Sequence, residues 1–538
     1  MSTSNAGARL RQILSSLLAT LAVLLALELG LRGIYALRRA SVDVVPLPYA
    51  VGHAYGPPPP WVDDQRILAE DPQLVWRGRP HARRRYMDFF NPVWQESDRS
   101  RLLRQFLPRL PASLARNPVW EVALNSEGFR EAELRGARAP GAIRILCLGD
   151  SWTFGANVGP DETYPRRLEA LLRDTHPGTS FEVLNLGVLG YSSFQGLELL
   201  RVRGLELDPD VLLIGFGMND GKFGGFRDRD LPGEEGPAPL PKRIARLLER
   251  IELLKLLRYA VERSRWEPPS PGEALREAAG PGDGEGQPVD YDANEPWIRV
   301  SPRDYRENVA EMLRLARQRG AAAVLLHNEF DDEGPYPAVL RELSTGWSVP
   351  LVDSSALLAG ERRRIEEGRA RKQGLLPAGP VRGSASGVDV IFRVQQGGYG
   401  APRGIFIAGV GPALGGAEPN RVRMHDDGTH GDEVAGDGVW SYRARFEAGT
   451  KVAYVYTNGG VAGRWVGLDV PHIRQFRIDR EAEGSTWIRP VEAFGEITLQ
   501  ADPWHTNGRG YALIAEAVLA ALGKTPEFRA RLGATAGP

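Results

Sequence analysis

The chain has 538 residues, of which 42% are hydrophobic and 25% are charged, and this describes a globular protein long enough for two or more domains. Its formal net charge of -1 gives no basic or acidic field, so no nucleic-acid partner is expected. The single cysteine, Cys147, excludes an intramolecular disulfide and leaves the redox compartment open.

A hydrophobic helix is expected over residues 13–37, after a tail of residues 1–12. As a helix, its apolar part Ile13–Leu31 would be about 28 Å long, close to the roughly 30 Å hydrocarbon core of a bilayer. We therefore predict a single-pass membrane anchor. Glu28 lies near one end of it, where it can pair with Arg32.

A cleaved signal peptide is the alternative interpretation of this segment. The anchor is favoured because Arg38 and Arg39 follow the apolar run, and no clear small-x-small cleavage site appears. Arginines flank the run on both sides, so charge alone does not decide its orientation.

Residues 41–141 are rich in Pro and Arg and predict a connecting and packing segment. From residue 142 to 360, strands alternate with helices, which predicts a parallel sheet covered on both faces. The expected strands are 143–148, 181–186, 211–216, 321–326 and 349–353, and the expected helices begin near 163, 197, 305 and 337. A last amphipathic helix over 508–522, within a segment 490–523, completes the domain. The fold class is therefore α/β, a three-layer αβα domain with a flavodoxin-like sheet.

Two insertions are expected to interrupt this domain. Residues 228–300 predict a helix near 241–263, followed by a disordered Gly/Pro/Glu linker over 266–296. Residues 380–480 alternate in short strands between Gly, Asn and Pro turns, which predicts an antiparallel β-sandwich.

Polar residues cluster where the predicted strands end, which is where open α/β sheets hold their ligands. Ser151 follows the first strand; on its own it could be a nucleophile, a phosphate-turn hydroxyl or a helix cap. Three further stretches fall at corresponding places: Asn185–Gly190, Gly217–Asp220 and Asp502–His505.

These four blocks, in this order, resemble the SGNH (GDSL-type) hydrolase family. The first block of the family is matched by Gly149-Asp150-Ser151, and its oxyanion glycine falls on Gly190. Its third and fourth blocks are matched by Gly217–Asp220 and Asp502–His505. The resemblance covers roughly 143–220, 303–355 and 500–522 and leaves both insertions unaccounted for.

The chemistry expected of these residues is that of a serine hydrolase. His505 would take the proton of the Ser151 hydroxyl, while Asp502 would hold the other ring nitrogen of the imidazole. The main-chain N–H groups of Ser151 and Gly190 and the side-chain amide of Asn219 would form an oxyanion hole. Each residue also has a purely structural interpretation, as a cap or a turn residue.

Other polar residues are expected to be structural. Asp150 and Asp220 would brace their turns. The remaining histidines, with no comparable partners in the sequence, would be surface or packing residues; they are His53, His81, His176, His327, His425, His430 and His472.

The predicted β-sandwich resembles, more loosely, a carbohydrate-binding module of the starch-binding type. The resemblance rests on Gly404–Gly409, Trp440 and the strand Lys451–Tyr456, and the tryptophan that the family has near 414–416 is absent. A structural or partner-docking role is the alternative. The oxygen-rich loop 425–438 fails the EF-hand spacing, so a solvated turn is favoured over a calcium site and no metal is predicted.

The function expected from the sequence is hydrolysis of an ester. The substrate would be an exported or cell-surface glycan that carries acetyl or other short acyl groups, or a small ester, and no metal or organic cofactor is expected. A glycan O-acyltransferase using the same residues and a non-catalytic carbohydrate-binding surface protein are the alternatives. The resemblance implies an extracytoplasmic hydrolase domain attached to a membrane by residues 13–37. Oligomeric state is left open.

Overall fold

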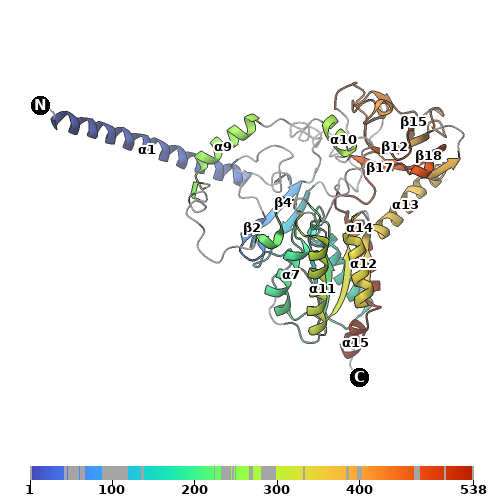
Figure 1. Cartoon of the computed structure of the whole chain (residues 1–538), viewed down its shortest axis with the longest axis horizontal. Coiled ribbons are helices and arrows are strands. Elements are labelled where there is room, and N and C mark those ends of the chain that lie inside the picture. Colours follow the sequence, from blue (N-terminus) through green and yellow to red (C-terminus); the bar gives the residue numbers. More distant parts are fainter. Residues whose placement is uncertain are drawn as a thin grey trace. The chain divides into compact units, whose positions relative to one another are not determined.

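The computed structural model describes most of the chain outside several loops and linkers (Figure 1). The described residues are 3–41, 45–46, 60, 67–87, 119–134, 138–222, 224–231, 244, 247–248, 250–265, 271–279, 298–330, 334–382, 387–396, 403–465, 473–501 and 504–535. They divide into two compact units, which are described separately: Met1–Arg66 with Glu234–Pro268, and Ile67–Gly233 with Pro269–Pro538.

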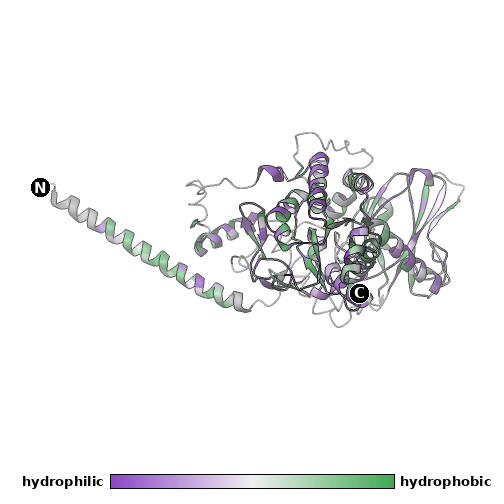
Figure 2. Ribbon diagram, turned by 90° about the horizontal axis from the view of Figure 1, so that it is seen from below, coloured by the Kyte–Doolittle hydropathy of each residue, from purple (hydrophilic) through white to green (hydrophobic). Residues whose placement is uncertain are grey.

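The first unit is built on a long helix, α1 (Thr3–Ser41), with a short strand β1 (Val45–Pro46) and a second helix, α9 (Glu252–Arg265). The stretch Gln12–Leu37 of α1 is long and apolar enough to cross a membrane, and most of its side chains are exposed. Figure 2 shows these apolar residues along most of α1. The predicted hydrophobic helix is therefore present.

Glu28, the acidic residue within this apolar stretch, accepts hydrogen bonds from several donors. Its carboxylate pairs with Arg32 at 2.7 Å, as predicted. It also accepts from the backbone N–H groups of Glu252 and Leu253, at 3.0 Å each. Those N–H groups open α9 and have no partner within that helix, so Glu28 acts as a cap for α9.

The second unit contains the predicted sheet, with five parallel strands in the order β10-β9-β8-β6-β7. The strands are β6 (Ile143–Gly149), β7 (Phe181–Asn185), β8 (Val211–Gly215), β9 (Ala322–His327) and β10 (Leu351–Asp353). This is the flavodoxin-like order, in which the chain reverses direction across the sheet between β6 and β8. The predicted fold class of the sheet is confirmed, and its three inner strands β6, β8 and β9 are buried on both faces.

Alternate residues of β6 point into two separate cores. Leu146 and Leu148 face one core with α7 (Ser193–Val202), α11 (Pro302–Gln318) and α12 (Tyr336–Trp347). Ile145 and Cys147 face the other core, which also includes residues from four further helices. These are α6 (Tyr164–Thr175), α13 (Ser354–Lys372), α14 (Gly508–Leu522) and α15 (Pro526–Thr535). Burial raises the pKa of the Cys147 thiol, as expected for a small core residue.

Several elements were not predicted from the sequence. The helix α13 is nearly half charged, and α15 lies beyond the predicted domain end. Residues 41–141, predicted as a connecting segment, contain two antiparallel strand pairs. These are β2 (Leu68–Asp71) with β3 (Val75–Gly78), and β4 (Arg83–Met87) with β5 (Val119–Ala123).

The prediction of a disordered linker over 266–296 was wrong for its first part. Residues Pro271–Ala279 form the helix α10, and Leu275 is fully buried there. This helix packs on β13 (Phe406–Gly409) and β16 (Lys451–Thr457), far along the sequence, so local composition gave no sign of it. The rest of the predicted linker, up to 296, lies outside the described residues.

Two four-stranded sheets follow α13 in the chain and share one hydrophobic core that includes Phe392 and Tyr454. One has the order β11-β18-β12-β15, with β11 (Gly379–Arg382), β18 (Ser485–Ala493), β12 (Val388–Gln395) and β15 (Val439–Phe446). The other has the order β14-β13-β16-β17, with β14 (Val422–Arg423) and β17 (Arg474–Arg477) at its edges. The predicted antiparallel pairing fails at one place, because β12 and β18 pair in parallel.

Short helical turns connect the larger elements. They are α5 (Ser151–Phe154), η3 (Pro160–Glu162), η4 (Gly204–Leu207), η5 (Asp228–Asp230), η7 (Pro412–Leu414) and η8 (Arg480–Ala482).

The close packing of α5 on the end of β7 makes Gly187 intolerant of a side chain. A Cβ at Gly187 would lie 2.3 Å from the backbone nitrogen of Phe154, whereas a Cβ at Gly346 in α12 would meet nothing within 4 Å. We expect Gly187→Ala to lower the melting temperature strongly and Gly346→Ala to leave it unchanged or raise it, since alanine favours a helix by about 1 kcal/mol over glycine. Thermal unfolding of both variants checks this, and equal melting temperatures would contradict it.

Candidate active site

Ser151 stands at the first position of α5, directly after the central strand β6. The side chain of Asp150 caps this short helix by accepting a hydrogen bond from the Trp152 backbone N–H at 2.9 Å. The turn closes at Gly155, whose φ of 80° suits a residue without a side chain. The sharp turn leaves Ser151 only 9% exposed, with its hydroxyl at the carboxyl edge of the sheet.

His505 meets Ser151 from the other end of the chain. Its Nε2 lies 2.7 Å from the Oγ of Ser151. The loop that carries it is closed by the Ala501 N–H, which donates to the His505 carbonyl at 2.9 Å. Immediately after it, Asn507 caps α14 by accepting from two backbone N–H groups. The third residue predicted with them, Asp502, lies outside the described residues.

Asn219, after β8, joins the other two strand ends through its side-chain amide. Its Nδ2 donates to Asp150 Oδ2 and to the carbonyl of Tyr191, at 3.1 Å each. Its Oδ1 accepts from the Lys222 ammonium at 2.8 Å. Burial raises the pKa of Asp150 to about 6, although the donor N–H of Trp152 opposes that shift. The bracing role predicted for Asp150 is therefore visible in its contacts, and its capping of α5 was not predicted.

Gly190 lies in the loop after β7 with a φ of 76°, a conformation that favours glycine. Among the described residues, no backbone acceptor takes a hydrogen bond from its N–H. Its carbonyl is occupied, because Arg299 Nη1 donates to it at 2.8 Å. The Gly190 N–H is therefore available as a donor, while the Gly190 carbonyl is held by Arg299.

Asp220 is a structural residue, as predicted. Its Oδ1 accepts from both the backbone N–H and the hydroxyl of Ser193, at 2.9 and 2.5 Å. This ties the end of β8 to the start of α7. Burial raises the pKa of Asp220 to about 7.

Three residues around these loops were not identified from the sequence: Trp76, Lys222 and Arg299. Trp76 Nε1 donates to the Leu189 carbonyl at 3.1 Å. Arg299 forms a buried ion pair with Asp228 at 2.7 Å. The contacts of Trp76 with Leu189 and of Arg299 with Gly190 each cross more than 100 residues of sequence, so no local spacing could have indicated them.

The expectation that the remaining histidines lack partners was wrong for His327. Its Nδ1 lies 3.2 Å from Asp353, because the parallel strands β9 and β10 end side by side. His425 also lies 3.5 Å from Asp427 and stacks on His430. His53 and His472 lie outside the described residues.

One group of carboxylates could hold a cation. Ligand oxygens of Asp426, Asp432 and Asp437, in the loop between β14 and β15, lie within 4.8 Å of one another. Burial raises the pKa of Asp426 and of Asp432, and repulsion by the Asp437 carboxylate adds to both shifts. The loop that the sequence predicts as a solvated turn thus brings three acids together.

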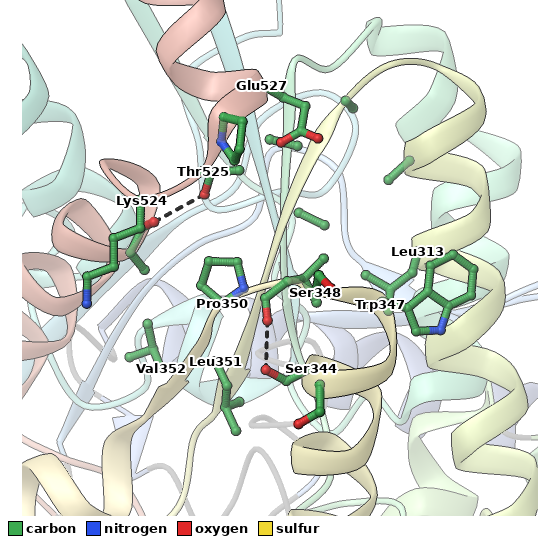
Figure 3. A pocket seen from close by; sticks show the side chains of 18 of the residues that line it. Leu313, Ser344, Trp347, Ser348, Pro350, Leu351, Val352, Lys524, Thr525 and Glu527 are labelled. Carbon is green, nitrogen blue, oxygen red and sulfur yellow. Dashed lines mark hydrogen bonds between the residues drawn. The ribbon is translucent and has the colours of Figure 1, made fainter.

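A hollow of about 760 Å³ lies beside the edge strand β10, and Figure 3 shows Trp347, Leu351 and Lys524 around it. None of Ser151, Gly190, Asn219 or His505 lines it. It is separate from the site described above.

The comparisons with known proteins give one family. Residues 147–280 match the model of the GDSL-like lipase/acylhydrolase family, a range that includes Ser151, Gly190 and Asn219. A comparison with curated proteins finds no match.

Solved structures similar to this chain are recorded at low identity. TesA is 17% identical, covers 40% of this chain and 80% of its own, and has a TM-score of 0.23. AlinE4, an esterase of the SGNH-hydrolase family, is 16% identical over 40% of this chain and 77% of its own, with a TM-score of 0.22. A GDSL-like lipase from Bacteroides thetaiotaomicron is 13% identical over 42% and 74%, with a TM-score of 0.22.

The family match falls on the sheet segment that carries Ser151, at the carboxyl ends of β6, β7 and β8. Residues 147–280 of the chain are thus similar to the GDSL-like lipase/acylhydrolase family, and this similarity supports an enzyme that hydrolyses ester bonds.

Proposed function

We propose that the protein is a serine esterase that removes acetyl or short acyl groups from exported or cell-surface glycans. The observation that carries the proposal is the 2.7 Å contact between Ser151 Oγ and His505 Nε2. A serine hydroxyl is a poor nucleophile until a base takes its proton, and a neutral imidazole at this distance is suited to do so.

The proposed reaction uses Ser151, His505 and Asp502 in the usual sequence of acyl transfer. Ser151 Oγ attacks the ester carbonyl while its proton passes to His505, and the alcohol then leaves with that proton. Water, activated by the same imidazole, hydrolyses the acyl-enzyme and restores Ser151. Asp502 would hold the other ring nitrogen and stabilise the imidazolium.

The negative charge on the reacting oxygen would be stabilised by the N–H groups of Ser151 and Gly190 and by the amide of Asn219. The available N–H of Gly190 supports this role. The Asn219 amide already donates to Asp150 and to the Tyr191 carbonyl, so the substrate oxygen would share one of these two hydrogens. The positive charge of Lys222 on the Asn219 oxygen polarises the amide and strengthens it as a donor.

The proposal has two alternatives, which differ from it in the acyl acceptor or in the surface that they need. A glycan O-acyltransferase would form the same acyl-enzyme and pass the acyl group to a sugar hydroxyl. A non-catalytic sugar binder would instead need exposed aromatics on the two β-sheets, and Tyr454 and Tyr456 are buried there, with their hydroxyls donating to Glu492. The proposed esterase reaction and the transferase alternative use no metal and no organic cofactor.

We further propose that α1 anchors the enzyme in a membrane, with the hydrolase domain on the extracytoplasmic side. The apolar surface of Gln12–Leu37 supports this, because its leucines are about half exposed in the chain itself. The pairing of Glu28 with Arg32 and with the start of α9 lowers the cost of an acid near the end of such a span.

Replacing the proposed nucleophile should abolish the chemistry without harming the fold. We expect Ser151→Ala to reduce release of acetate from a chromogenic acetyl ester to background, and a serine-directed phosphonate to label the wild type only. Ser180→Ala, at an exposed position, should behave as the wild type. Adding an oligosaccharide acceptor tests the transferase alternative: acetylated sugar in place of free acetate would favour it, and activity in Ser151→Ala would contradict the mechanism.

Removing the Asn219 amide should slow catalysis beyond its effect on stability. We expect Asn219→Ala to lower kcat by about 10²- to 10³-fold, the usual result of losing one oxyanion donor. Its melting temperature should also fall, because Asp150 and the Tyr191 carbonyl lose a donor.

A matched control for this variant is Asn308→Ala. Asn308 donates to the Ser193 hydroxyl at 3.0 Å and contacts no proposed catalytic group in the described structure. This variant should lose stability and keep its kcat per folded molecule. If Asn219→Ala behaves in the same way, Asn219 is a structural residue only.

The membrane proposal predicts both retention and orientation. Expressed in a bacterium with two membranes, the full 59.1 kDa chain should stay in the membrane pellet after alkaline carbonate extraction. Alkaline phosphatase fused to the C-terminus should be active, and a green fluorescent protein fused there should be dark. A shortened soluble chain would indicate a cleaved signal, and the opposite pair of reporters would reverse the orientation.

A further inference from the structure

The loop that carries Gly190 is held by side chains from three distant parts of the chain. Three successive carbonyls of this loop each accept a hydrogen bond from one of these side chains. The Leu189 carbonyl accepts from the Trp76 indole, the Gly190 carbonyl from the Arg299 guanidinium, and the Tyr191 carbonyl from the Asn219 amide. A loop outside regular secondary structure owes its conformation to such contacts, because it has no ladder of backbone hydrogen bonds of its own.

The first of these contacts also controls the direction of the Gly190 N–H. The Leu189 carbonyl and the Gly190 N–H belong to one peptide unit, which is planar and trans, so the two groups point in opposite directions. The hydrogen bond of 3.1 Å from Trp76 Nε1 fixes the carbonyl. The Gly190 N–H must therefore point away from the indole N–H.

Trp76 is itself held firmly. Its own carbonyl accepts from the Tyr191 hydroxyl at 2.7 Å, and its ring meets the Tyr191 ring edge to face with centroids 6.0 Å apart. Val75 before it has a φ of 67°, which is strained for a β-branched residue and indicates that the surrounding contacts determine the backbone here.

Arg299 contacts both the Trp76 ring and the Gly190 carbonyl. Its guanidinium carbon lies 5.3 Å from the centre of the Trp76 ring, and its other nitrogens pair with Asp228 and the Gln195 side chain at 2.7 to 2.9 Å. Arg299 is only 8% exposed and Asp228 is fully buried. The loss of Arg299 would leave a buried carboxylate unpaired, which would disturb the fold as well as the loop.

We propose that Trp76 is a positioning residue of the esterase site: its indole N–H holds the Leu189 carbonyl so that the Gly190 N–H faces the oxygen on which negative charge develops. This inference rests on the proposed function. It assigns a role to the β2–β3 hairpin, which precedes the hydrolase sheet in the chain.

The test removes the indole N–H and keeps an aromatic side chain. In Trp76→Phe, and in a second variant with benzothienylalanine at position 76, where sulfur replaces the N–H in a side chain of the same shape, we expect kcat to fall about 5- to 30-fold. KM should stay within about twofold, since the ground state needs the donor less. An alkyl boronic acid, which forms a tetrahedral anionic adduct with the serine, should lose affinity by the same factor as kcat/KM.

The matched control is Trp347→Phe. Trp347 also contacts an arginine, Arg317, at 4.6 Å from its ring centre, but it lies on α12 away from the Gly190 loop. It should keep the kcat and boronate affinity of the wild type. Melting temperatures of all variants separate a loss of fold from a loss of positioning.

The remaining outcomes overturn the proposal in distinguishable ways. If the boronate inhibits the wild type but neither Trp76 variant changes kcat or boronate affinity, Trp76 does not position the donor. A raised KM with unchanged kcat would make it a substrate contact instead. If the boronate does not inhibit the wild type, the serine mechanism is wrong and the role of Trp76 falls with it.

Discussion

The hydrogen bond between Ser151 and His505 joins segments that are 354 residues apart, and the arrangement of the hydrolase domain depends on that closure. Ser151 is placed by the central strand β6, and His505 by the loop that starts α14. Because α14 packs on α6 and on the sheet, the domain is complete only when the last part of the chain has folded onto the first. The two β-sheets and α10 are accommodated between them without interrupting the order of the parallel strands.

A second constraint is the buried polar network at the carboxyl edge of the sheet. Asp150, Asn219 and Asp220 are almost inaccessible to water, and an unpaired polar group there would be costly. Each of them forms a hydrogen bond with a group from the loop after another strand, so the loops after β6, β7 and β8 fix one another's positions. The raised pKa values of both acids are the consequence of that burial. The same contacts thus stabilise the fold and orient the proposed catalytic groups.

The first unit shows how an acid can be accommodated in an apolar helix. Glu28 is neutralised by Arg32 and in turn satisfies the open N–H groups of α9. The helix α9 has leucines exposed on its own surface, at positions 254 and 257. An apolar helix capped onto a second, partly apolar helix is consistent with a unit that meets a membrane, and the pairing is local to this unit.

Much of the αβα domain could be predicted from the sequence because its information is local. Buried parallel strands are continuous apolar runs, so 143–148 and 211–216 were identifiable, and the helix 508–522 has a clear apolar face. The polar blocks at the strand ends followed from the same pattern, and the structure brings Ser151 and His505 into contact. By contrast, α10 and α13 were missed because their composition is polar or helix-neutral and their packing partners are far along the chain.

What only the tertiary structure decided is how the loops at the site are held. The carbonyls of Leu189 and Gly190 are fixed by Trp76 and Arg299, which come from segments that the sequence indicated only as a connector and the end of an insertion. Likewise, His327 meets Asp353 because parallel strands place their ends side by side. The sequence by itself determined the sheet, its order of elements and the candidate nucleophile and base, since these depend on hydrophobic pattern and motif. Hydrogen bonds between residues more than 100 positions apart leave no local pattern, so they could be found only in the folded chain.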